Sequence, residues 1–522
     1  ALAHAGRHAQ SVDAYAAALP LQLDHAASTL PPQQHQQPVS SAPPSESRRR
    51  RIVFYCRLRA HAGAESIGSD VWGPTTLAKH GVGGSEEAVI FASRQLARRG
   101  WEVIVYAHPP PEDLAHGSDD GDGGGVAWRM WYELPRYEGD GSGVDVLVSW
   151  RNVEGALLLP RATSRYVWLQ DIVEHPEAYH TALMRRLDGV LVLSAFHARG
   201  LPRHAAPKAV LTSNGIEAST LVPAGPNRHW RFMYAAWPTA GLEPLLERWP
   251  ALRDAITQSP LGKARKRELG GDAEAPTLAV YYGFPKWLEA MYGGEAWYPR
   301  WRERMETLLR QPGVEYYGMV NASQVAKAYA AAGFYVFPSD KPETSGVNLM
   351  KAQAMGAIPV TSRHPNSSMP EVTGLYDMGP PVPAGAVAIQ RDSSWFGQWT
   401  RALIDAASTP PEELAERRAE MVGWARDTFD WQTVTTTWHD EFSRAVGDAK
   451  QPQRAPRSRR LSTDQPAESA LDMDASECAK AAEVKVSFGS PEAISGSSFI
   501  SPTAQAHASS HPPTPLPPPP SP

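Results

Sequence analysis

The chain has 522 residues and a formal net charge of −5, and 42% of its residues are hydrophobic. This length suffices for two or three domains, and the near-neutral charge argues against nucleic acid or an anionic membrane as the main partner. The two cysteines, Cys56 and Cys478, exclude a disulfide framework and favour a reducing compartment, so we expect a cytoplasmic protein. No run approaches eighteen apolar residues, which predicts no membrane-spanning helix. Because the first residue is alanine rather than methionine, a preceding segment with a targeting signal stays open.

Both ends of the chain differ in composition from its centre. Residues 1–26 are alanine-rich, and their Gly6, Tyr15 and Ala18-Leu19 spacing resembles the second half of a tetratricopeptide repeat. Such a repeat needs neighbours to bury its apolar face, so we predict the last helix of an upstream array; a plain alanine-rich amphipathic helix is the alternative. Residues 27–50 and 448–522, rich in Pro and Ser, are predicted to be a disordered linker and a disordered tail. The upstream repeats or the Pro-rich end would offer a protein partner its binding site.

The first folded segment is a strand–helix–strand unit. The apolar run 52–56 predicts a buried strand, a glycine turn at 81–84 leads into a helix that ends near Gly100, and 101–106 is the next strand. The turn lacks the G-x-G-x-x-G pattern and the acidic residue that binds ribose, which disfavours a nicotinamide enzyme. Gly83 and Gly84 let the backbone approach a sugar or phosphate without a Cβ in the way; a tight turn without a ligand is the alternative.

Strand and helix signals then alternate through two successive blocks. In the first block, strands are predicted at 144–149, 165–169 and 189–193, and an Asn-Gly turn at 214–215 closes the block. In the second block, strands are predicted at 231–234, 277–282, 314–317, 334–337 and 358–360. This alternation predicts an α/β fold with two Rossmann-like, doubly wound domains that face a cleft. The predicted domains are residues 51–228 and 229–428, followed by a helix at 429–447 that crosses back to the first domain.

The stretch from Pro338 to Val360 organises the second block. It reads as a strand end, a polar loop with Glu343 and Gly346, a helix from Val347, and a further strand at 358–360. Loops between the carboxyl end of a parallel strand and a helix N-terminus are where open α/β sheets bind ligands, because free N–H groups there attract anions and hydroxyls.

This stretch resembles the donor loop of the GT-B glycosyltransferases of family 4 (glycosyl transferases group 1), over about residues 50–447. The matching features are Pro338-Ser339, Glu343, Gly346 and the run 353–360, together with GGSEEAV at 83–89, LARRGWEV at 96–103 and the Asn-Gly turn at 214–215. The resemblance implies a retaining transferase that moves a sugar from a nucleotide-sugar to a glycan, protein or small-molecule acceptor. It implies no metal and no cofactor besides the nucleotide-sugar co-substrate.

The resemblance also implies site residues. Glu343 would accept hydrogen bonds from hydroxyls of the donor sugar, and the N–H groups of Ser345, Gly346 and Val347 would hold the sugar and phosphate. The remaining implied residues are Gly83 and Gly84 facing the diphosphate, Gly318 and Val320 bordering the base, and Gln170 and Asp171 on the acceptor side.

The chain departs from the family pattern at four positions. Ala235 and Ala240 stand where two phosphate-gripping cations are expected, and Lys351 replaces a carboxylate that would bind the ribose. Lys351 either reaches the diphosphate or faces solvent. Gln170 stands where a histidine is expected, with His175 nearby as a substitute or a surface residue. Two hypotheses follow: an active transferase with an altered donor site, and a degenerate GT-B module that binds a glycan or protein partner without turnover.

Overall fold

The computed structural model describes residues 49–57, 71–114, 125–134, 143–159, 161–173, 176–222, 228–269, 275–284, 288–289, 292–382 and 392–448. All of them belong to one compact unit, Ala1–Ser462, and the second unit, Thr463–Pro522, lies outside them. The predicted repeat helix, nearly all of the predicted linker, the predicted tail beyond Asp448, and His175 also lie outside the described residues.

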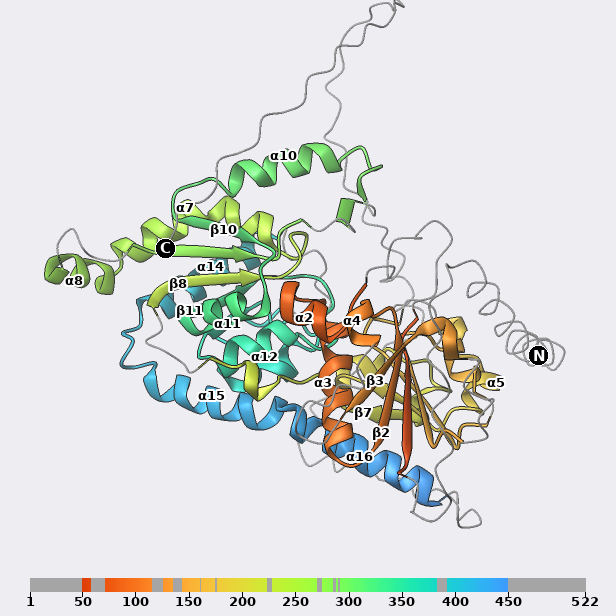
Figure 1. Cartoon of the computed structure of the whole chain (residues 1–522). Helices are drawn as coiled ribbons and strands as arrows, with labels where there is room; N and C mark the ends of the chain where they lie inside the picture. Colours follow the sequence, from red (N-terminus) through yellow and green to blue (C-terminus); the bar gives the residue numbers. More distant parts are fainter. Residues whose placement is uncertain are drawn as a thin grey trace, which may run out of the picture. The chain divides into compact units, whose positions relative to one another are not determined.

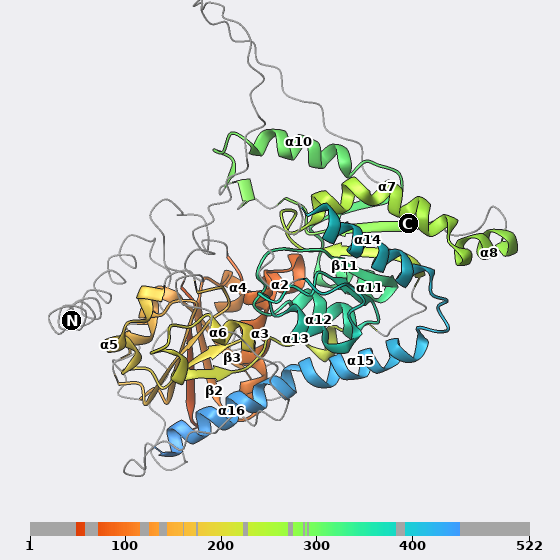
Figure 2. The same cartoon turned by 180° about the vertical axis from the view of Figure 1, so that it is seen from behind.

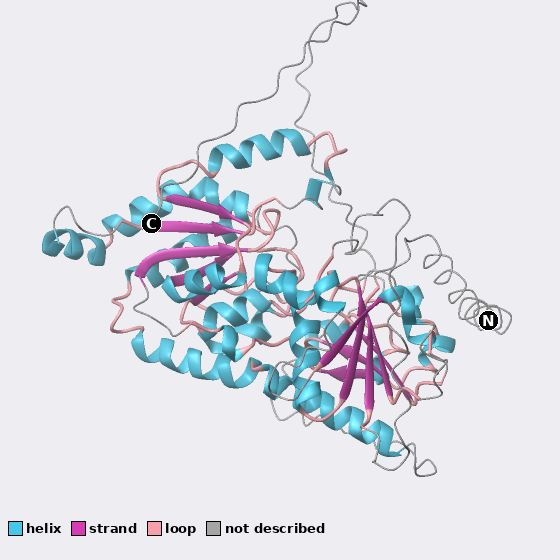
Figure 3. Cartoon of the chain, in the orientation of Figure 1, coloured by secondary structure: helices cyan, strands magenta, loops and turns pink. Residues whose placement is uncertain are grey.

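The first sheet has seven parallel strands in the order β3-β2-β1-β4-β5-β6-β7. Figure 3 shows the strands of the structure as magenta arrows. Its strands are β1 (Arg51–Tyr55), β2 (Glu102–Ala107), β3 (Val126–Met130), β4 (Val146–Trp150), β5 (Ser164–Trp168), β6 (Gly189–Val192) and β7 (Ala209–Leu211). The central strands are runs of apolar residues buried on both faces, which is typical of a parallel sheet covered by helices.

The second sheet has five parallel strands in the order β10-β9-β8-β11-β12. Its strands are β8 (Arg228–Ala235), β9 (Thr277–Tyr281), β10 (Val314–Gly318), β11 (Ala332–Phe337) and β12 (Ile358–Thr361). The sequence therefore predicted the fold class correctly: two parallel α/β sheets, one in each block. The domain boundaries themselves stay a prediction.

Helices connect the strands and cover the sheets (Figure 1). In the first block they are α2 (Pro74–His80), α3 (Gly84–Arg98), α4 (Pro111–Leu114), α5 (Thr181–Met184) and α6 (Ala195–Arg199). In the second block they are α7 (Leu242–Gln258), α8 (Pro260–Leu269), α10 (Tyr298–Leu308), α11 (Ala322–Ala331), α12 (Val347–Ala354), α13 (Met369–Thr373), α14 (Ser393–Ser408), α15 (Ala415–Phe429) and α16 (Trp431–Asp448). The polar segment 259–275 includes the helix α8. Among the described helices, none is both long and apolar enough to cross a membrane.

Helix α16 runs from the second block back to the first sheet (Figure 2). Its Trp431, Trp438 and Phe442 are buried in the hydrophobic core of the first sheet. The rings of Trp438 and Trp168 of β5 meet edge to face, with their centroids 4.6 Å apart. Phe429, the last residue of α15, belongs instead to the core of the second sheet. Helix α16, the last described element of the chain, therefore completes the hydrophobic core of the first sheet.

The strand order of each sheet reverses at one place. In the first sheet β1 leads to β2 and β3 on one side, and to β4 through β7 on the other. In the second sheet β8 leads to β9 and β10 on one side, and to β11 and β12 on the other. Ligands of open α/β sheets bind outside the carboxyl ends of the strands at such reversals. Candidate site residues are therefore expected just after β1 and β4, and just after β8 and β11.

Candidate functional site

Glu343 lies in the loop after β11, at the reversal of the second sheet. Its carboxylate accepts the backbone N–H groups of Ser345 at 3.3 Å and Gly346 at 3.2 Å. Burial raises the pKa of this carboxyl group, the hydrogen bonds from its own loop oppose that rise, and the charge of Asp171 adds to it. Two of the N–H groups expected to hold the donor are therefore engaged by Glu343 in this structure.

Gly346 forms the N-cap of α12 in the left-handed conformation, with φ of 64°. Other residues adopt this conformation only at a cost, so glycine is what allows the loop to turn directly into the helix. The first N–H groups of a helix have no partner within the helix and carry a partial positive charge. The turn at Gly346 thus places Glu343 beside the N-terminus of α12.

The N-terminus of α3 approaches the N-terminus of α12 from the first block. A methyl group added to Gly84 would lie 3.8 Å from Cβ of Val347, and one added to Gly81 would lie 3.6 Å from the carbonyl oxygen of Val320. Both Gly83 and Gly84 are exposed. The structure therefore brings together predicted donor residues from both blocks, and the positive ends of two helices converge there.

Lys351 does not face solvent, so that alternative was wrong. Its ammonium group lies 2.7 Å from the carboxylate of Glu87 in the first turn of α3, and the two side chains are 13% and 11% exposed. The reason is that α3 covers the side of α12 on which Lys351 lies. Its positive charge is therefore paired within the protein, and contact of Lys351 with a diphosphate stays a prediction.

Ala235 and Ala240, the positions where cations are expected, are both buried. The carbonyl oxygen of Ala235 accepts hydrogen bonds from the Asn348 amide at 2.6 Å and the Tyr335 hydroxyl at 3.0 Å. A cation does reach this place from another segment. Nζ of Lys341 donates to Oγ1 of Thr239, the residue before Ala240, at 2.8 Å. Burial lowers the pKa of the Lys341 ammonium group, and the negative charge of Asp340 opposes that effect.

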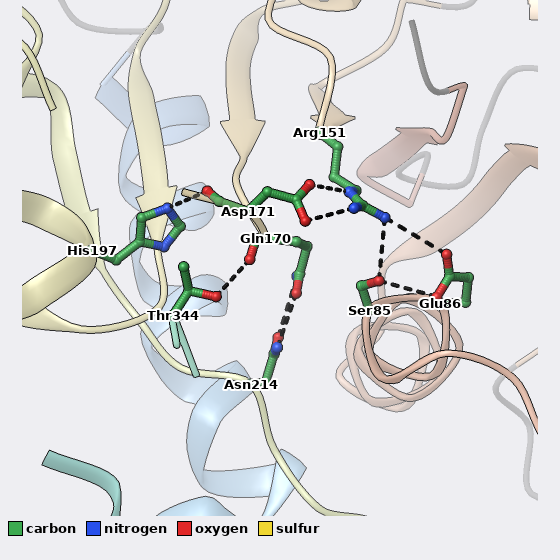
Figure 4. Close-up of polar contacts among 8 residues, drawn as sticks. All are labelled: Ser85, Glu86, Arg151, Gln170, Asp171, His197, Asn214 and Thr344. Carbon is green, nitrogen blue, oxygen red and sulfur yellow. Dashed lines mark hydrogen bonds and ion pairs between the residues drawn. The ribbon is translucent and has the colours of Figure 1, made fainter. Parts of the chain in front are cut away.

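Arg151 lies at the reversal of the first sheet, directly after β4 (Figure 4). Its guanidinium group holds the carboxylate of Asp171 by two hydrogen bonds, one of them 2.6 Å long. It also lies 3.4 Å from the Ser85 hydroxyl and 3.8 Å from the Glu86 carboxylate. Its backbone φ is +59°, a conformation that costs a non-glycine residue about 1–3 kcal/mol and persists where surrounding contacts hold it. Arg151 thus ties the ends of β4 and β5 to the N-terminus of α3.

Gln170, predicted on the acceptor side, is buried and exchanges two amide hydrogen bonds with Asn214, at 2.9 and 3.3 Å (Figure 4). The backbone carbonyl oxygen of Gln170 accepts a hydrogen bond from the Thr344 hydroxyl at 2.6 Å. The Ser194 hydroxyl in turn donates to the Thr344 carbonyl oxygen at 2.9 Å. Gln170 therefore helps to hold the Glu343 loop against the first block. Direct contact of Gln170 or Asp171 with an acceptor stays a prediction.

His197 supports the same strand end. Its Nε2 lies 2.9 Å from the Asp171 carbonyl oxygen, and its Nδ1 accepts the Leu193 N–H at 3.3 Å. These partners require a neutral ring that carries its proton on Nε2. Consistent with this, burial lowers the pKa of His197 to about 4. The ring positions the Asp171 backbone and does not exchange protons near neutral pH.

The predicted base-side residue Gly318 ends β10 with φ of +64°. Beside it, the rings of Tyr317 and Tyr281 stack with centroids 4.8 Å apart and an interplanar angle of 5°. Tyr317 is 46% exposed and Met319 62% exposed. The strand end thus presents a flat, accessible aromatic surface, while Val320 lies near the glycine turn of the first block.

Sequence reasoning missed Arg151, Lys341, Ser85, Glu86, Asn214 and His197. A signal existed for the first two: Arg151 directly follows a buried strand, and Lys341 stands two residues before Glu343 in a loop already selected. The other four are recognisable only once the loops are placed in space.

Comparison with known proteins identifies the architecture. Residues 286–389, which include the Glu343 loop, match the family model described as Glycosyl transferases group 1. The structure is similar to HepE of Anabaena in complex with UDP and glucose, at 14% identity over 76% of this chain and 99% of that chain, with a TM-score of 0.50. The fold is a GT-B fold.

Two further GT-B structures are similar at lower TM-scores. They are sucrose-phosphate synthase from Thermosynechococcus elongatus, at 15% identity over 77% of this chain and 100% of that chain with a TM-score of 0.47, and a glycosyltransferase from Rickettsia africae, at 12% identity over 77% and 99% with a TM-score of 0.47. No curated protein matches the chain. At these identities the structural neighbours show the fold alone, and the match to the group 1 model is limited to part of the second block.

Proposed function

We propose that this protein is a retaining glycosyltransferase of family 4 that moves a sugar from a nucleotide-sugar donor to an acceptor. The observation that carries the proposal is the position of Glu343, in a loop where the N-termini of α12 and α3 converge at the reversal of the second sheet. The group 1 match over residues 286–389 and the GT-B fold support it. The HepE structure contains UDP and glucose, which makes a UDP-sugar the first donor to test.

In the proposed reaction, the bond between the anomeric carbon of the sugar and the diphosphate oxygen breaks, and a bond to the acceptor oxygen forms on the same face. The acceptor proton passes to the departing diphosphate. Negative charge therefore grows on the diphosphate, and donors fixed beforehand in space stabilise it most effectively. In the proposal this role falls to the N–H groups at the N-termini of α12 and α3 other than those of Ser345 and Gly346, which Glu343 engages. Glu343 orients the sugar by accepting hydrogen bonds from its hydroxyl groups.

The raised pKa of Glu343 fits this role. Hydrogen bonds from sugar hydroxyl groups stabilise a poorly solvated carboxyl group more than a solvated one, because water does not already supply those hydrogen bonds. In the proposal no metal takes part. Action in the cytoplasm belongs to the same proposal and rests on the cysteine usage.

A non-catalytic binding module is the second candidate. Ala235 and Ala240 lack the two expected charges, and the charge of Lys351 is paired with Glu87. Each lost charge-assisted hydrogen bond is worth about 1.5–3 kcal/mol, so several together would reduce turnover by orders of magnitude. The same fold would then bind a glycan or a protein partner without catalysing a reaction.

Calorimetric titration with a panel of UDP- and GDP-sugars tests the proposal. Binding of one of them followed by release of the nucleoside diphosphate supports the transferase, whereas binding without release supports the binding module. If no nucleotide-sugar binds, the transferase proposal is refuted.

The variant Glu343→Gln then tests the role of the carboxylate, with the exposed Glu303→Gln on α10 as the matched control. We expect Glu343→Gln to lower nucleoside diphosphate release about 10- to 100-fold, the loss of one charge-assisted hydrogen bond, and Glu303→Gln to leave it unchanged. Equal rates in the two variants would remove Glu343 from the mechanism.

A further inference from the structure

Lys341 and Thr239 lie at the reversal of the second sheet. Lys341 follows β11 and Thr239 follows β8, and these two strands are hydrogen-bonded neighbours. The 2.8 Å hydrogen bond from Nζ of Lys341 to Oγ1 of Thr239 therefore spans the two loops that border the crevice. Nucleotide phosphates bind at such crevices in doubly wound sheets. A positive charge is thus fixed at the mouth of the crevice.

The charge of Lys341 is available, unlike that of two other cations near the cleft. Arg151 is held by Asp171 and Glu86, and Lys351 by Glu87. Among the residues that the structure describes, no carboxylate forms an ion pair with Lys341, and its side chain bonds a neutral hydroxyl. The negative charge of the preceding residue, Asp340, acts on it electrostatically.

A partly buried ammonium group without an anionic partner is costly unless a ligand supplies the anion. An ammonium group has three N–H bonds, and Thr239 takes one of them. The other two can be donated to phosphate oxygens. Both the geometry and the charge at this position therefore suit a diphosphate.

The loop that carries Lys341 is fixed in place. The backbone N–H of Lys341 donates to the Ser339 hydroxyl at 3.1 Å, and the Ser362 hydroxyl donates to the Ser339 carbonyl oxygen at 2.6 Å. Ser339 and Ser362 are both fully buried. A cation held by such an anchored loop loses little freedom when a ligand binds, which favours affinity.

We propose that Lys341 binds the diphosphate of the nucleotide and supplies, from the β11 loop, the positive charge that Ala235 and Ala240 do not provide. This inference rests on the proposed function. Glu343 and Lys341 are two residues apart in the same loop. A nucleotide-sugar whose sugar contacts Glu343 would therefore have its phosphates close to Lys341. In this proposal the cation stands on the β11 side of the crevice, whereas the family pattern expects it after β8.

The test compares Lys341→Met with Lys263→Met, which changes an exposed lysine on α8, a helix at the outer end of the second block (Figure 1). Methionine keeps the length and apolar part of the lysine side chain and removes the charge. Each protein is titrated with UDP, GDP and ADP by calorimetry, and with the corresponding nucleosides by ligand-observed NMR. Lys341→Arg is included because it retains the charge, and thermal unfolding shows that each variant folds.

We expect Lys341→Met to weaken binding of the nucleoside diphosphate about 10- to 100-fold, or ~1.4–2.8 kcal/mol, with nucleoside binding unchanged. Lys341→Arg should restore most of the loss, and Lys263→Met should behave like the wild type. If the wild type binds a nucleoside diphosphate and Lys341→Met binds it equally well, the inference is overturned and the proposed function stands. An equal loss for nucleoside and diphosphate also overturns it, because Lys341 would then only tether Thr239. If the wild type binds none of the three, the proposed function fails and the inference with it.

Discussion

The ion pair between Lys351 and Glu87 joins the two blocks and allows a quantitative prediction. At 2.7 Å and an effective dielectric constant of about 20, the attraction between two such charges is roughly 6 kcal/mol before desolvation. Removing both charges from water costs several kcal/mol each, so the pair as a whole contributes little. Breaking it from one side leaves the other charge buried and unpaired. We therefore expect Lys351→Met and Glu87→Gln each to cost about 3 kcal/mol, the lower end of the range for buried pairs, because both side chains remain 11–13% exposed.

The assay is a double-mutant cycle of guanidinium unfolding, followed by tryptophan fluorescence. The double variant should be about as stable as either single variant or more stable, which gives a coupling energy of about 3 kcal/mol or more. Lys79 and Glu112 provide the control pair, with 57% and 59% exposure and a separation of 3.7 Å, and should show a coupling near zero. If the two cycles give equal coupling, or the effects of Lys351→Met and Glu87→Gln simply add, the pair does not join the blocks as inferred.

Three further predictions follow from single positions. Trp438→Ala should lower the free energy of unfolding by about 3–5 kcal/mol, because the ring is fully buried against Trp168; denaturant unfolding measures it, and a loss below about 1 kcal/mol would contradict the packing. Gly241→Ala should cost more than about 1 kcal/mol in the same assay, because φ is +98° and the added methyl would lie 2.5 Å from the Pro338 carbonyl oxygen; an unchanged midpoint would refute that geometry. Because the folded-state pKa of Glu343 is raised, the stability of the wild type relative to Glu343→Gln should be greatest at acid pH and fall as the pH rises above the ordinary glutamate range; a difference independent of pH would show that the carboxyl group is not desolvated.

The fold was predictable from the sequence because its signals are local. The apolar run from Phe334 to Phe337 forms the fully buried β11. Gly346 ends the following loop in a conformation that favours glycine. Parallel strands and their crossover helices alternate along the chain, so each strand or helix could be predicted from a short stretch of sequence.

The site was predictable only in part because its contacts join distant segments. Glu87 and Lys351 are 264 positions apart, and the sequence around either residue does not indicate that the two are in contact. The helical spacing of residues 347–355 identifies the helix but does not say that α3 covers the side bearing Lys351. The same limit hid the partners of Arg151, which come from the N-terminus of α3 and from the end of β5.

The distribution of charge across the cleft explains how the site could still bind an anion despite the departures from the family pattern at positions 235, 240 and 351. Lys351 stands where the family pattern has a carboxylate, and the carboxylate of Glu87 faces it from the other block. The pair is neutral as a whole and joins the last turn of α12 to the first turn of α3. Arg151 does the same for Asp171 in the first block. Besides these pairs the site holds the carboxyl groups of Glu86, Asp340 and Glu343. Its remaining donors to an anion are the helix ends and the ammonium group of Lys341, which is paired with no carboxylate among the described residues. An anion would therefore be held locally, by Lys341 and the helix ends on the β11 side of the crevice, and not by a net positive charge of the site.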